Sequence, residues 1–221
     1  MKPPAMKLYG YWRSSCSYRV RIALAHKGLS VEHAAVHLVK DGGQQHAADF
    51  TQKNPMGQVP VLEIEGDGGP VRLGQSVAIL EYLEEAHPEP ALLPSDAVLR
   101  ARARQLTEIV NAGIQPLQNL RVMQLLERQH GVDAKAWARG HILSGLLAFQ
   151  AVAESVAGRY CVGDAVSFAD CALVPQLYNA RRFGIDVEAE LPLLHRVDTA
   201  CAALEAFQAA HPDRQPDAQP S

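Results

Sequence analysis

The pattern of apolar residues changes at a proline-rich stretch near residue 90, and this change constrains the fold more than any other feature. Before it, segments with the pattern of strands alternate with segments that have helical spacing. After it, nothing reads as a strand, and Ala, Leu, Arg, Glu and Gln recur with helical spacing. Three prolines between residues 88 and 94 mark the boundary. We therefore expect an α/β domain at 1–87, a linker at 88–97 and an all-α domain at 98–221 that ends in a polar tail.

The first domain is expected to contain a strand, helix, strand unit followed by a hairpin and a last helix. Gly28 suits the C-terminal cap of the first helix, a glycine-rich turn joins the hairpin strands, and Pro88 ends the last helix. The expected elements are strands at 6–10 and 31–38, a helix at 15–27, strands at 59–66 and 71–73, and a helix at 75–88.

The second domain is expected to be a helical bundle. Ser167 and Asp170 have the spacing of a capping box, in which each side chain satisfies backbone N–H groups at a helix start. The expected helical segments are 97–130, 134–157, 168–182 and 190–210.

Charge and cysteine content exclude several classes of protein. The net charge of −3, with Lys and Arg scattered, gives no bulk electrostatic reason to expect a nucleic acid or an anionic membrane as partner. No apolar run reaches the roughly 18 residues that span a bilayer, and the N-terminus lacks a secretory signal, so we expect a cytoplasmic location. The cysteines, at 16, 161, 171 and 201, fit neither a metal site nor a disulfide scaffold. Any functional cysteine is expected to act singly.

Hydroxyl and thiol groups gather where the first strand passes into the first helix. Ser14, Ser15 and Cys16 stand at the expected N-terminus of that helix. Backbone N–H groups are unpaired there and the helix dipole places partial positive charge at that end, so an anion or a thiolate would be stabilised. Serines at this position are also good helix caps. Position alone leaves both interpretations open.

Two further segments could bind an extended ligand. Pro60 enters a strand, and a cis bond there would leave the amide and carbonyl of Val59 free for a ligand, although most X–Pro bonds are trans. Gln75 and Ser76 open the last helix of the first domain, where they would either bind a carboxylate or cap the helix.

These segments together resemble the thioredoxin-like domain of cytosolic glutathione transferases, which an all-α domain follows in that family. The resemblance extends to the zeta class through YWRSSCSYRVRIALAHKG, KDGGQQ, NPMGQVPVL, QSVAILEYLEE, GIQPLQNL, YCVGDAVSFAD and HPDRQPD, which run over nearly the whole chain. The specific part is SSCSYRVRIAL with GIQPLQNL. The NPxGxVP and QS patterns are shared by most classes.

The resemblance implies glutathione as the cofactor and assigns residues to it. Taken alone, one of these residues, Gln45, would equally fit a solvated loop. The implied contacts are Ser14, Ser15 and Cys16 around the sulfur, Val59 beside cis-Pro60 at the peptide backbone, Gln75 and Ser76 at the γ-glutamyl end, Gln45 near the glycyl end, and Gln115 and Asn119 from the helical domain.

The substrate that the resemblance implies is a small dicarboxylate, and arginine binds carboxylates through two parallel hydrogen bonds. Arg13 adjoins the serines, and Arg182 matches the family position proposed to hold a substrate carboxylate. Arg121 follows GIQPLQNL, where related maleylpyruvate isomerases also carry arginine. Each of the three would also fit a solvent-exposed or ion-paired role.

The implied reaction is the glutathione-dependent cis–trans isomerisation of maleylacetoacetate to fumarylacetoacetate, a step of tyrosine and phenylalanine catabolism, by reversible thiolate addition. Lowering the pKa of a thiol by about two units requires roughly 2.7 kcal/mol of stabilisation, which a hydroxyl donor and a helix N-terminus could supply. The alternatives are maleylpyruvate isomerisation, dehalogenation of α-halo acids, thiol transfer through a mixed disulfide on Cys16, and a non-catalytic binding protein. The family also implies a homodimer.

Overall fold

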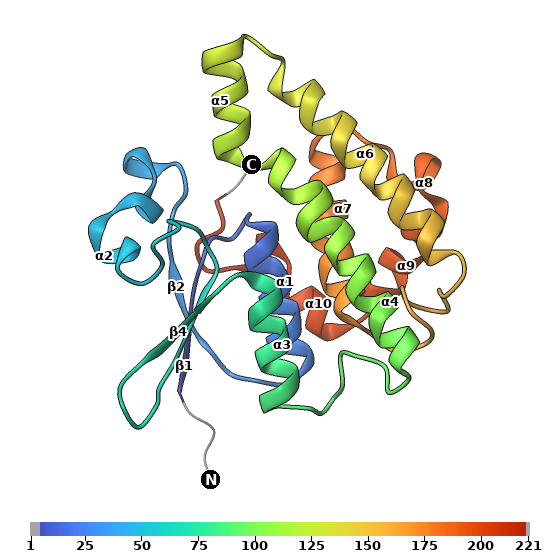
Figure 1. Ribbon diagram of the computed structural model, residues 1–221, viewed down its shortest axis with the longest axis horizontal. Coiled ribbons are helices and arrows are strands. Elements are labelled where there is room, and N and C mark those ends of the chain that lie inside the picture. Colours follow the sequence, from blue (N-terminus) through green and yellow to red (C-terminus); the bar gives the residue numbers. More distant parts are fainter. Residues whose placement is uncertain (1–4, 220–221) are drawn as a thin grey trace. The chain divides into compact units, whose positions relative to one another are not determined.

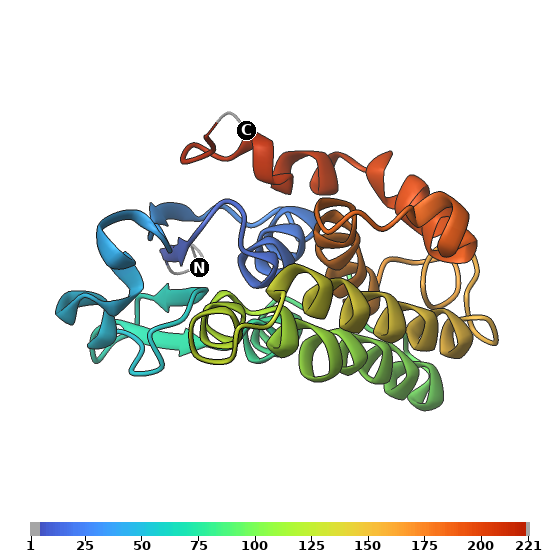
Figure 2. The ribbon, with the colours of Figure 1, turned by 90° about the horizontal axis from the view of Figure 1, so that it is seen from above.

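A computed structural model describes residues 5–219, which fall into two compact units. The first unit comprises the chain up to Pro90 together with the segment from Glu205 onward, and the second runs from Ala91 to Leu204. The sequence expectation placed residues 205–221 with the helical domain. They group instead with the first unit because α10 (Glu205–Ala210) packs against α1 (Ser15–His26), as Figure 2 shows.

The first unit is built on a four-stranded mixed sheet with the strand order β2-β1-β3-β4 (Figure 1). The first two strands are parallel, and the other neighbouring pairs are antiparallel. This order of elements confirms the expected strand, helix, strand unit and hairpin of a thioredoxin-like domain. The elements are β1 (Met6–Gly10), α1, β2 (Glu32–Ala35), η1 (Lys40–Gly42), η2 (Gln44–His46), α2 (Ala48–Thr51), β3 (Val61–Ile64), β4 (Val71–Gly74), α3 (Ser76–Ala86), α10 and η5 (Pro212–Arg214).

Alternation along β1 divides its side chains between two layers of packing. Tyr9 lies on the face covered by α2, where its ring meets that of Phe50 edge to face with the centroids 6.4 Å apart. Leu8 points to the opposite face and is fully buried, because successive side chains of a strand alternate. That face is covered by α1 and α3, which pack against each other (Figure 1).

A buried ion pair ties the end of α1 to the end of α3. The side chain of Lys27 is completely buried, and its Nζ donates to Glu84 Oε2 at 2.8 Å. The same ammonium donates to the carbonyls of His87 at 2.7 Å and Pro90 at 3.0 Å. Each proton of the ammonium therefore has an acceptor, which is the condition under which a buried charge is tolerated.

The second unit is helical, as the sequence predicts, and contains no strand beyond an isolated bridge between Ala157 and Gly163. Two expectations are corrected. Residues 190–210 do not form one helix, because the helix that begins at Pro192 ends at Ala202 and α10 begins only at Glu205. Residues 97–130 do not form one helix, because Pro116 lacks the N–H that a continuous helix needs. The elements are α4 (Ala97–Glu108), the π-helix η3 (Ile109–Ile114), the 3-10 helix η4 (Gln115–Gln118), α5 (Leu120–His130), α6 (Ala134–Ala153), α7 (Phe168–Arg182), α8 (Val187–Glu190) and α9 (Pro192–Ala202).

The expected capping box opens α7. Asp170 Oδ2 accepts from the N–H and the hydroxyl of Ser167, both at 2.8 Å, and its Oδ1 accepts from the N–H of Cys161 at 2.8 Å. Burial is complete here, and desolvation raises the pKa of the Asp170 carboxyl and raises that of the Cys161 thiol well above its ordinary value. Desolvation also raises the pKa of the Cys201 thiol. These groups are structural, since a buried protonated thiol is a poor nucleophile.

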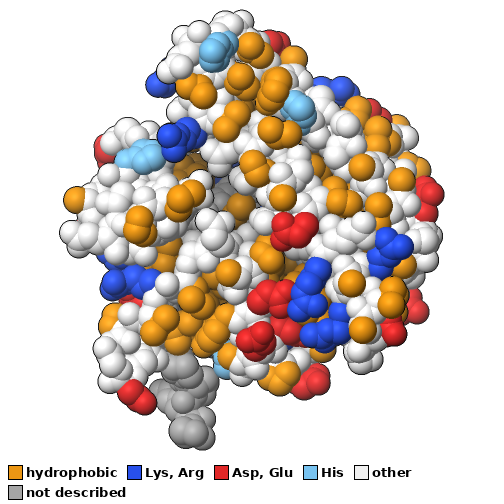
Figure 3. Space-filling model, in the orientation of Figure 1, with side chains coloured by type: hydrophobic (Ala, Val, Ile, Leu, Met, Phe, Trp, Pro, Cys, Tyr) orange, Lys and Arg blue, Asp and Glu red, His pale blue; other side chains and the backbone are white. Residues whose placement is uncertain are grey.

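Charged side chains of both signs are mixed on the surface. On the face drawn in Figure 3, Lys and Arg side chains lie among Asp and Glu side chains and exposed apolar groups, with no continuous basic field over its described part. None of the helices within residues 5–219 has the length and apolar character needed to cross a bilayer.

The Lys27 pair gives a test of the first unit. Replacing Lys27 by Met should lower the free energy of unfolding by about 3 kcal/mol, because Glu84 would stay buried without its cation. Lys7→Met is the matched control, since Lys7 pairs with Glu32 on an exposed part of the same unit and should contribute little. Urea denaturation of both variants measures the difference, and equal losses would contradict the assignment.

Candidate active site

The register of the sheet brings the sequence motifs of the first unit to the same end of the strands, and this end is the sheet edge at which the candidate site lies. Val61 pairs with Tyr9 of β1 and with Gly74 of β4, so the ends of β1 and β4 lie beside the start of β3. The Ser14 to Cys16 segment follows β1, Val59 and Pro60 precede β3, and Gln75 follows β4. All three motifs therefore begin at the same end of the sheet.

The loop that carries Gln45 leaves from this edge as well. Gly10 at the end of β1 pairs with Ala35 at the end of the parallel strand β2. A Cβ atom added at Gly57, whose φ is +60°, would lie 3.2 Å from the carbonyl oxygen of Gln45. Glycine at this position lets the loop after β2 approach the segment before β3.

The start of α1 combines a helix cap with unpaired donors. Ser14 is the N-cap, and its Oγ accepts from the N–H of Ser17 at 3.2 Å. Ser14 therefore caps the helix, which its position in the sequence also allowed. Its hydroxyl proton stays free to donate. Within the described chain no hydrogen bond engages the N–H groups of Ser15 and Cys16. Two amides and a hydroxyl can therefore donate to an anion at the positive end of the α1 dipole.

The side chains that follow the cap differ in their environment. Ser15 is buried, and no hydrogen bond within residues 5–219 engages its hydroxyl. Cys16 is the one cysteine with partial exposure, whereas Cys161, Cys171 and Cys201 are buried. All four thiols are free of disulfides, so a thiol at this site acts without a resolving cysteine. Residues 5–219 contain no group of His, Cys, Asp and Glu arranged to hold a metal ion.

The segment before β3 offers the backbone groups that a peptide would need. The Val59–Pro60 bond is cis, which the sequence left open. The N–H and the carbonyl of Val59 make no hydrogen bond to the described residues, while the preceding carbonyl, that of Gln58, accepts from Asn54 Nδ2 at 2.8 Å. Val59 therefore presents a donor and an acceptor to an extended partner.

Gln45 is buried, which differs from the solvated loop residue that its sequence position also allowed. Its Nε2 donates to the carbonyl of Leu38 at 3.3 Å and lies 3.0 Å from Nε2 of His46. Its Oε1 is buried and has no partner within the described residues. The Oε1 of Gln45 is therefore a hydrogen-bond acceptor for which the described chain supplies no donor.

The start of α3 is a second site for an anion. Gln75 precedes the helix at φ +67°, a conformation that costs a non-glycine residue about 1–3 kcal/mol and that occurs mostly where function maintains it. No side chain caps the helix, so the N–H groups of Ser76, Val77 and Ala78 have no partner among the described residues. A carboxylate would satisfy them.

A buried arginine links the two helix starts, and sequence reasoning did not single it out. Arg19 lies in the second turn of α1, is completely buried, and donates from Nη1 to Ser76 Oγ at 3.1 Å. Its positive charge adds to the two helix dipoles at this edge. The available signal was a pair of arginines, Arg19 and Arg21, inside an otherwise apolar helix.

Arg13 is the cation next to the Ser14 hydroxyl in sequence. Its guanidinium stacks on the ring of Trp12 with Cζ 4.9 Å from the ring centroid. No carboxylate of the described chain forms an ion pair with it within 4.0 Å. The planar face is thus occupied and the edge that carries the donors is left for a carboxylate.

The second unit holds the remaining residues expected from the sequence. Gln115 opens η4 and is half-buried, and Asn119 caps α5 by accepting from the N–H of Arg121 at 3.0 Å. The Arg121 side chain is exposed. Arg182 ends α7, lies exposed, and donates to Asn179 Oδ1 at 3.2 Å.

A pair of buried amides that the sequence analysis missed fixes the segment carrying Gln115 and Asn119. Gln118 Nε2 donates to Gln176 Oε1 at 2.6 Å, and Gln176 Nε2 donates back to Gln118 Oε1 at 3.2 Å. The reciprocal bonds satisfy both buried side chains and join η4 to α7. Two glutamines 58 residues apart carry no sequence signal of pairing.

Comparison with known proteins connects these two units to one family. Residues 4–85 match the family model for the glutathione S-transferase N-terminal domain, and residues 138–205 match the model for the C-terminal domain. Maleylacetoacetate isomerase of Rattus norvegicus is 50% identical over 210 residues, which are 95% of this chain and 94% of that protein. Maleylpyruvate isomerase of Ralstonia sp is 45% identical over 96% of this chain and 99% of that protein.

Solved structures agree with these sequence matches. Maleylacetoacetate isomerase from Anaeromyxobacter dehalogenans 2CP-1, with glutathione bound in its active site, superposes with a TM-score of 0.91 at 54% identity. The match covers 99% of this chain and 100% of that one. A holo maleylpyruvate isomerase described as a bacterial zeta-class enzyme gives a TM-score of 0.89 at 43% identity, over 96% of this chain and 100% of that one.

A close approach of helices gives a test of the second unit. A Cβ atom at Gly145 of α6 would overlap the side chain of Ile114, which is fully buried directly before Gln115. Gly145→Ala should therefore destabilise the protein by about 1–3 kcal/mol through overpacking. Gly140→Ala, at an exposed position of the same helix with open space around it, should stabilise by up to about 1 kcal/mol. Thermal denaturation distinguishes them, and stabilisation by both changes would refute the close contact.

Proposed function

Because the chain belongs to the glutathione S-transferase family, we propose that it catalyses the glutathione-dependent isomerisation of maleylacetoacetate to fumarylacetoacetate. The observation that carries the proposal is the start of α1. There the backbone N–H groups of Ser15 and Cys16 have no partner in the described chain, and the hydroxyl of Ser14 lies next to them in sequence. Several relatives of similar length carry the name maleylacetoacetate isomerase, which supports this substrate.

The residues at the sheet edge fit glutathione by the type of group each one offers. Val59 presents a donor and an acceptor to the cysteinyl backbone, and the buried Oε1 of Gln45 would accept from the glycyl N–H. Gln75, Ser76 and the free amides of α3 suit the γ-glutamyl carboxylate. In this arrangement the sulfur lies at the start of α1. The assignment extends to Gln115 and Asn119 of the second unit.

Bound glutathione supplies a thiolate that adds reversibly to the substrate's double bond and thereby permits rotation about it. The residues of this chain keep that sulfur ionised at neutral pH. The Ser14 hydroxyl, held by its bond to the N–H of Ser17, can donate to the sulfur, and the amides of Ser15 and Cys16 together with the helix dipole favour negative charge. Fixed donors of this kind need no reorganisation during the reaction.

The arginines would hold the two substrate carboxylates and offset negative charge that develops during addition. Arg13 has donors left over from its contact with Trp12, and Arg182 lies at the C-terminal end of α7, where a cation is favourable. The second candidate is maleylpyruvate isomerisation, since maleylpyruvate isomerases are among the relatives and the solved structures. The arginine at position 121 favours it, because the family resemblance expects arginine there in maleylpyruvate isomerases.

The oligomeric state and the cellular location belong to the same proposal. We infer a homodimer from the family. Light scattering in solution measures it. We also propose a cytoplasmic location, which the family and the four cysteines without disulfides support.

The isomerase proposal predicts turnover that requires a free thiol. Purified protein with glutathione should convert maleylacetoacetate to fumarylacetoacetate, whereas S-methylglutathione should bind and give no turnover because its sulfur cannot ionise. Product formation followed by absorbance measures both. A rate equal to that of buffer with glutathione would refute the proposal, and a higher kcat/KM for maleylpyruvate would favour the second candidate.

The role of Cys16 predicts a partial loss. Cys16→Ala should lower isomerase kcat/KM by about tenfold, because the thiol is removed while the backbone N–H at the same position stays in place. Cys16→Ser, which keeps a small donor, should retain more activity. Unchanged isomerase activity together with lost disulfide exchange would instead indicate thiol transfer.

A further inference from the structure

The loop before the Ser14 cap is held by a network that the proposed function does not use. Tyr11 N–H donates to Ser17 Oγ at 3.4 Å, and its carbonyl accepts from the N–H of Ser14 at 3.0 Å. The carbonyl of Trp12 accepts from Arg21 Nη2 at 3.0 Å, and the N–H of Trp12 donates to Asp217 Oδ2 at 3.0 Å. Every backbone polar group of Tyr11 and Trp12 is therefore engaged.

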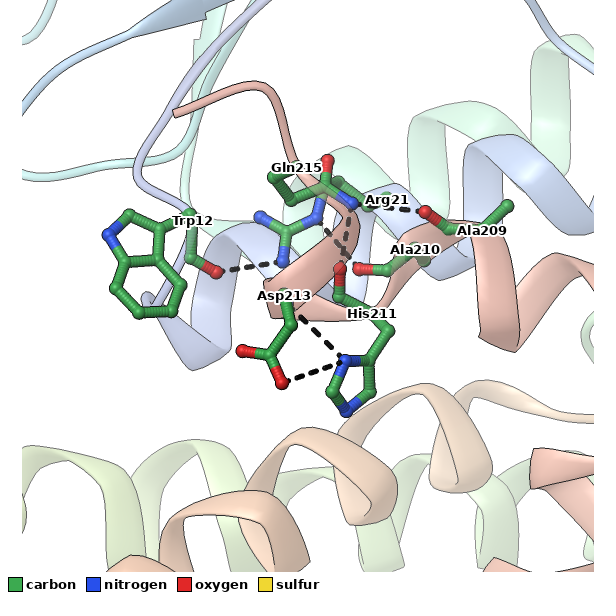
Figure 4. A network of polar contacts seen from close by, with 7 residues as sticks. All are labelled: Trp12, Arg21, Ala209, Ala210, His211, Asp213 and Gln215. Atoms are coloured by element: carbon green, nitrogen blue, oxygen red, sulfur yellow. Dashed lines mark hydrogen bonds and ion pairs between the residues drawn. The ribbon is translucent and has the colours of Figure 1, made fainter. Parts of the chain in front are cut away.

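Arg21 is the centre of this network (Figure 4). Its side chain emerges from α1 and lies buried, with 6% of the residue exposed. While Nη1 and Nη2 face the carbonyls of Tyr11 and Trp12, Nε donates to the carbonyl of Ala210 at 3.0 Å. One guanidinium thus joins the loop before the active-site helix to the end of α10.

The segment at 211–217 is itself fixed in shape. Gln215 is buried, and its Nε2 donates to the carbonyls of Ala209 at 3.0 Å and His211 at 2.9 Å (Figure 4). The ring of His211 meets that of Tyr18 of α1 edge to face. Residues 211–217 have the sequence HPDRQPD, which is one of the segments of the zeta-class resemblance and has no assigned function. These contacts hold segment 211–217 in a defined conformation against α1 and α10.

Asp217 closes the network over a long stretch of chain. The bond from Trp12 N–H to its carboxylate spans 205 residues, and it is charge-assisted because Asp217 is the acceptor. Trp12 lies two residues before the Ser14 cap. The position of the carboxylate consequently decides the orientation of the peptide that leads into the cap.

We propose that the C-terminal segment 211–217 positions the thiolate site, with Asp217 and Arg21 as positioning residues. This inference deepens the proposed function and rests on it. The donors at the start of α1 stabilise a thiolate only while they are held in place, and a displacement of about 1 Å can cost as much as 100-fold in rate. Without the Asp217 bond, the Trp12 amide would turn to water and the cap would lose one of its fixed ends.

The test uses the full-length protein and reads the thiol directly. Asp217→Ala should raise the pKa of the bound glutathione thiol by about one unit, which is a tenfold change in its ionisation constant. It should lower isomerase kcat by a similar factor and change the KM for the dicarboxylate little. Ultraviolet absorbance of the thiolate against pH measures the pKa, and amide hydrogen exchange of residues 11–16 reports whether the loop is released.

Two variants control the experiment. Asp217→Asn keeps an oxygen that can accept from Trp12 N–H, so it should retain a thiol pKa close to that of the unchanged protein. Asp213→Ala removes a carboxylate of the same segment whose side chain is 68% exposed and whose partner is His211, so it should change neither reading. An unaltered thiol pKa in Asp217→Ala, or an Asp217→Asn variant as impaired as Asp217→Ala, would overturn the inference.

The outcomes also separate this inference from the proposed function. If the unchanged protein binds glutathione with a lowered thiol pKa and does not isomerise maleylacetoacetate, the substrate assignment fails while the pKa comparison still decides the role of Asp217. If Asp217→Ala is too unstable to purify, Asp217→Asn and hydrogen exchange in the unchanged protein remain. Rapid exchange of the Trp12 amide there would refute the bond.

Discussion

Val61 of β3 pairs with Tyr9 of β1 on one side and with Gly74 of β4 on the other. Because β3 is antiparallel to both neighbours, the chain leaves β1, enters β3 and leaves β4 at one end of the sheet. The two strands that end there are followed by α1 and α3, whose N-termini then face the same edge. A site for a ligand that carries two negative groups, one at the start of each helix, follows from this register.

The edge keeps features that weaken the protein when no ligand is bound. Amides at the starts of α1 and α3 have no partner in the described chain, the Oε1 of Gln45 is buried alone, and Gln75 adopts a positive φ. The positive φ of Gln75 and the buried, unpaired acceptor of Gln45 cost free energy of folding. The Arg21 network, which holds the loop before α1, offsets part of this cost next to the site. Strain at a site and firm packing behind it are what a preorganised binding site requires.

Local sequence signals predicted most of the elements. The capping box starts α7 where Ser167 and Asp170 indicated, and three strands of the first unit lie inside their expected ranges, while β4 runs one residue beyond 71–73 to Gly74. These signals are local, since the apolar period of a strand and the chemistry of a helix cap act over a few residues. The interruption at 109–119 was missed because its composition is helical and Pro116 alone marks the break. The partners of Gln118, Arg19 and Asp217 were missed because pairing of distant side chains leaves no local pattern.

The sequence by itself determined the two kinds of domain, the helix start at Ser14 and the family to which those motifs belong, because each depends on residues that are neighbours in the chain. Only the tertiary structure decided that the Val59–Pro60 bond is cis, with the N–H and carbonyl of Val59 unpaired, and that Gln45 is buried. It also decided that Asp217, near the end of the described chain, binds the loop before the first helix. These depend on contacts between residues far apart in sequence. Such contacts form only once the sheet register and the packing of α10 on α1 bring those residues together.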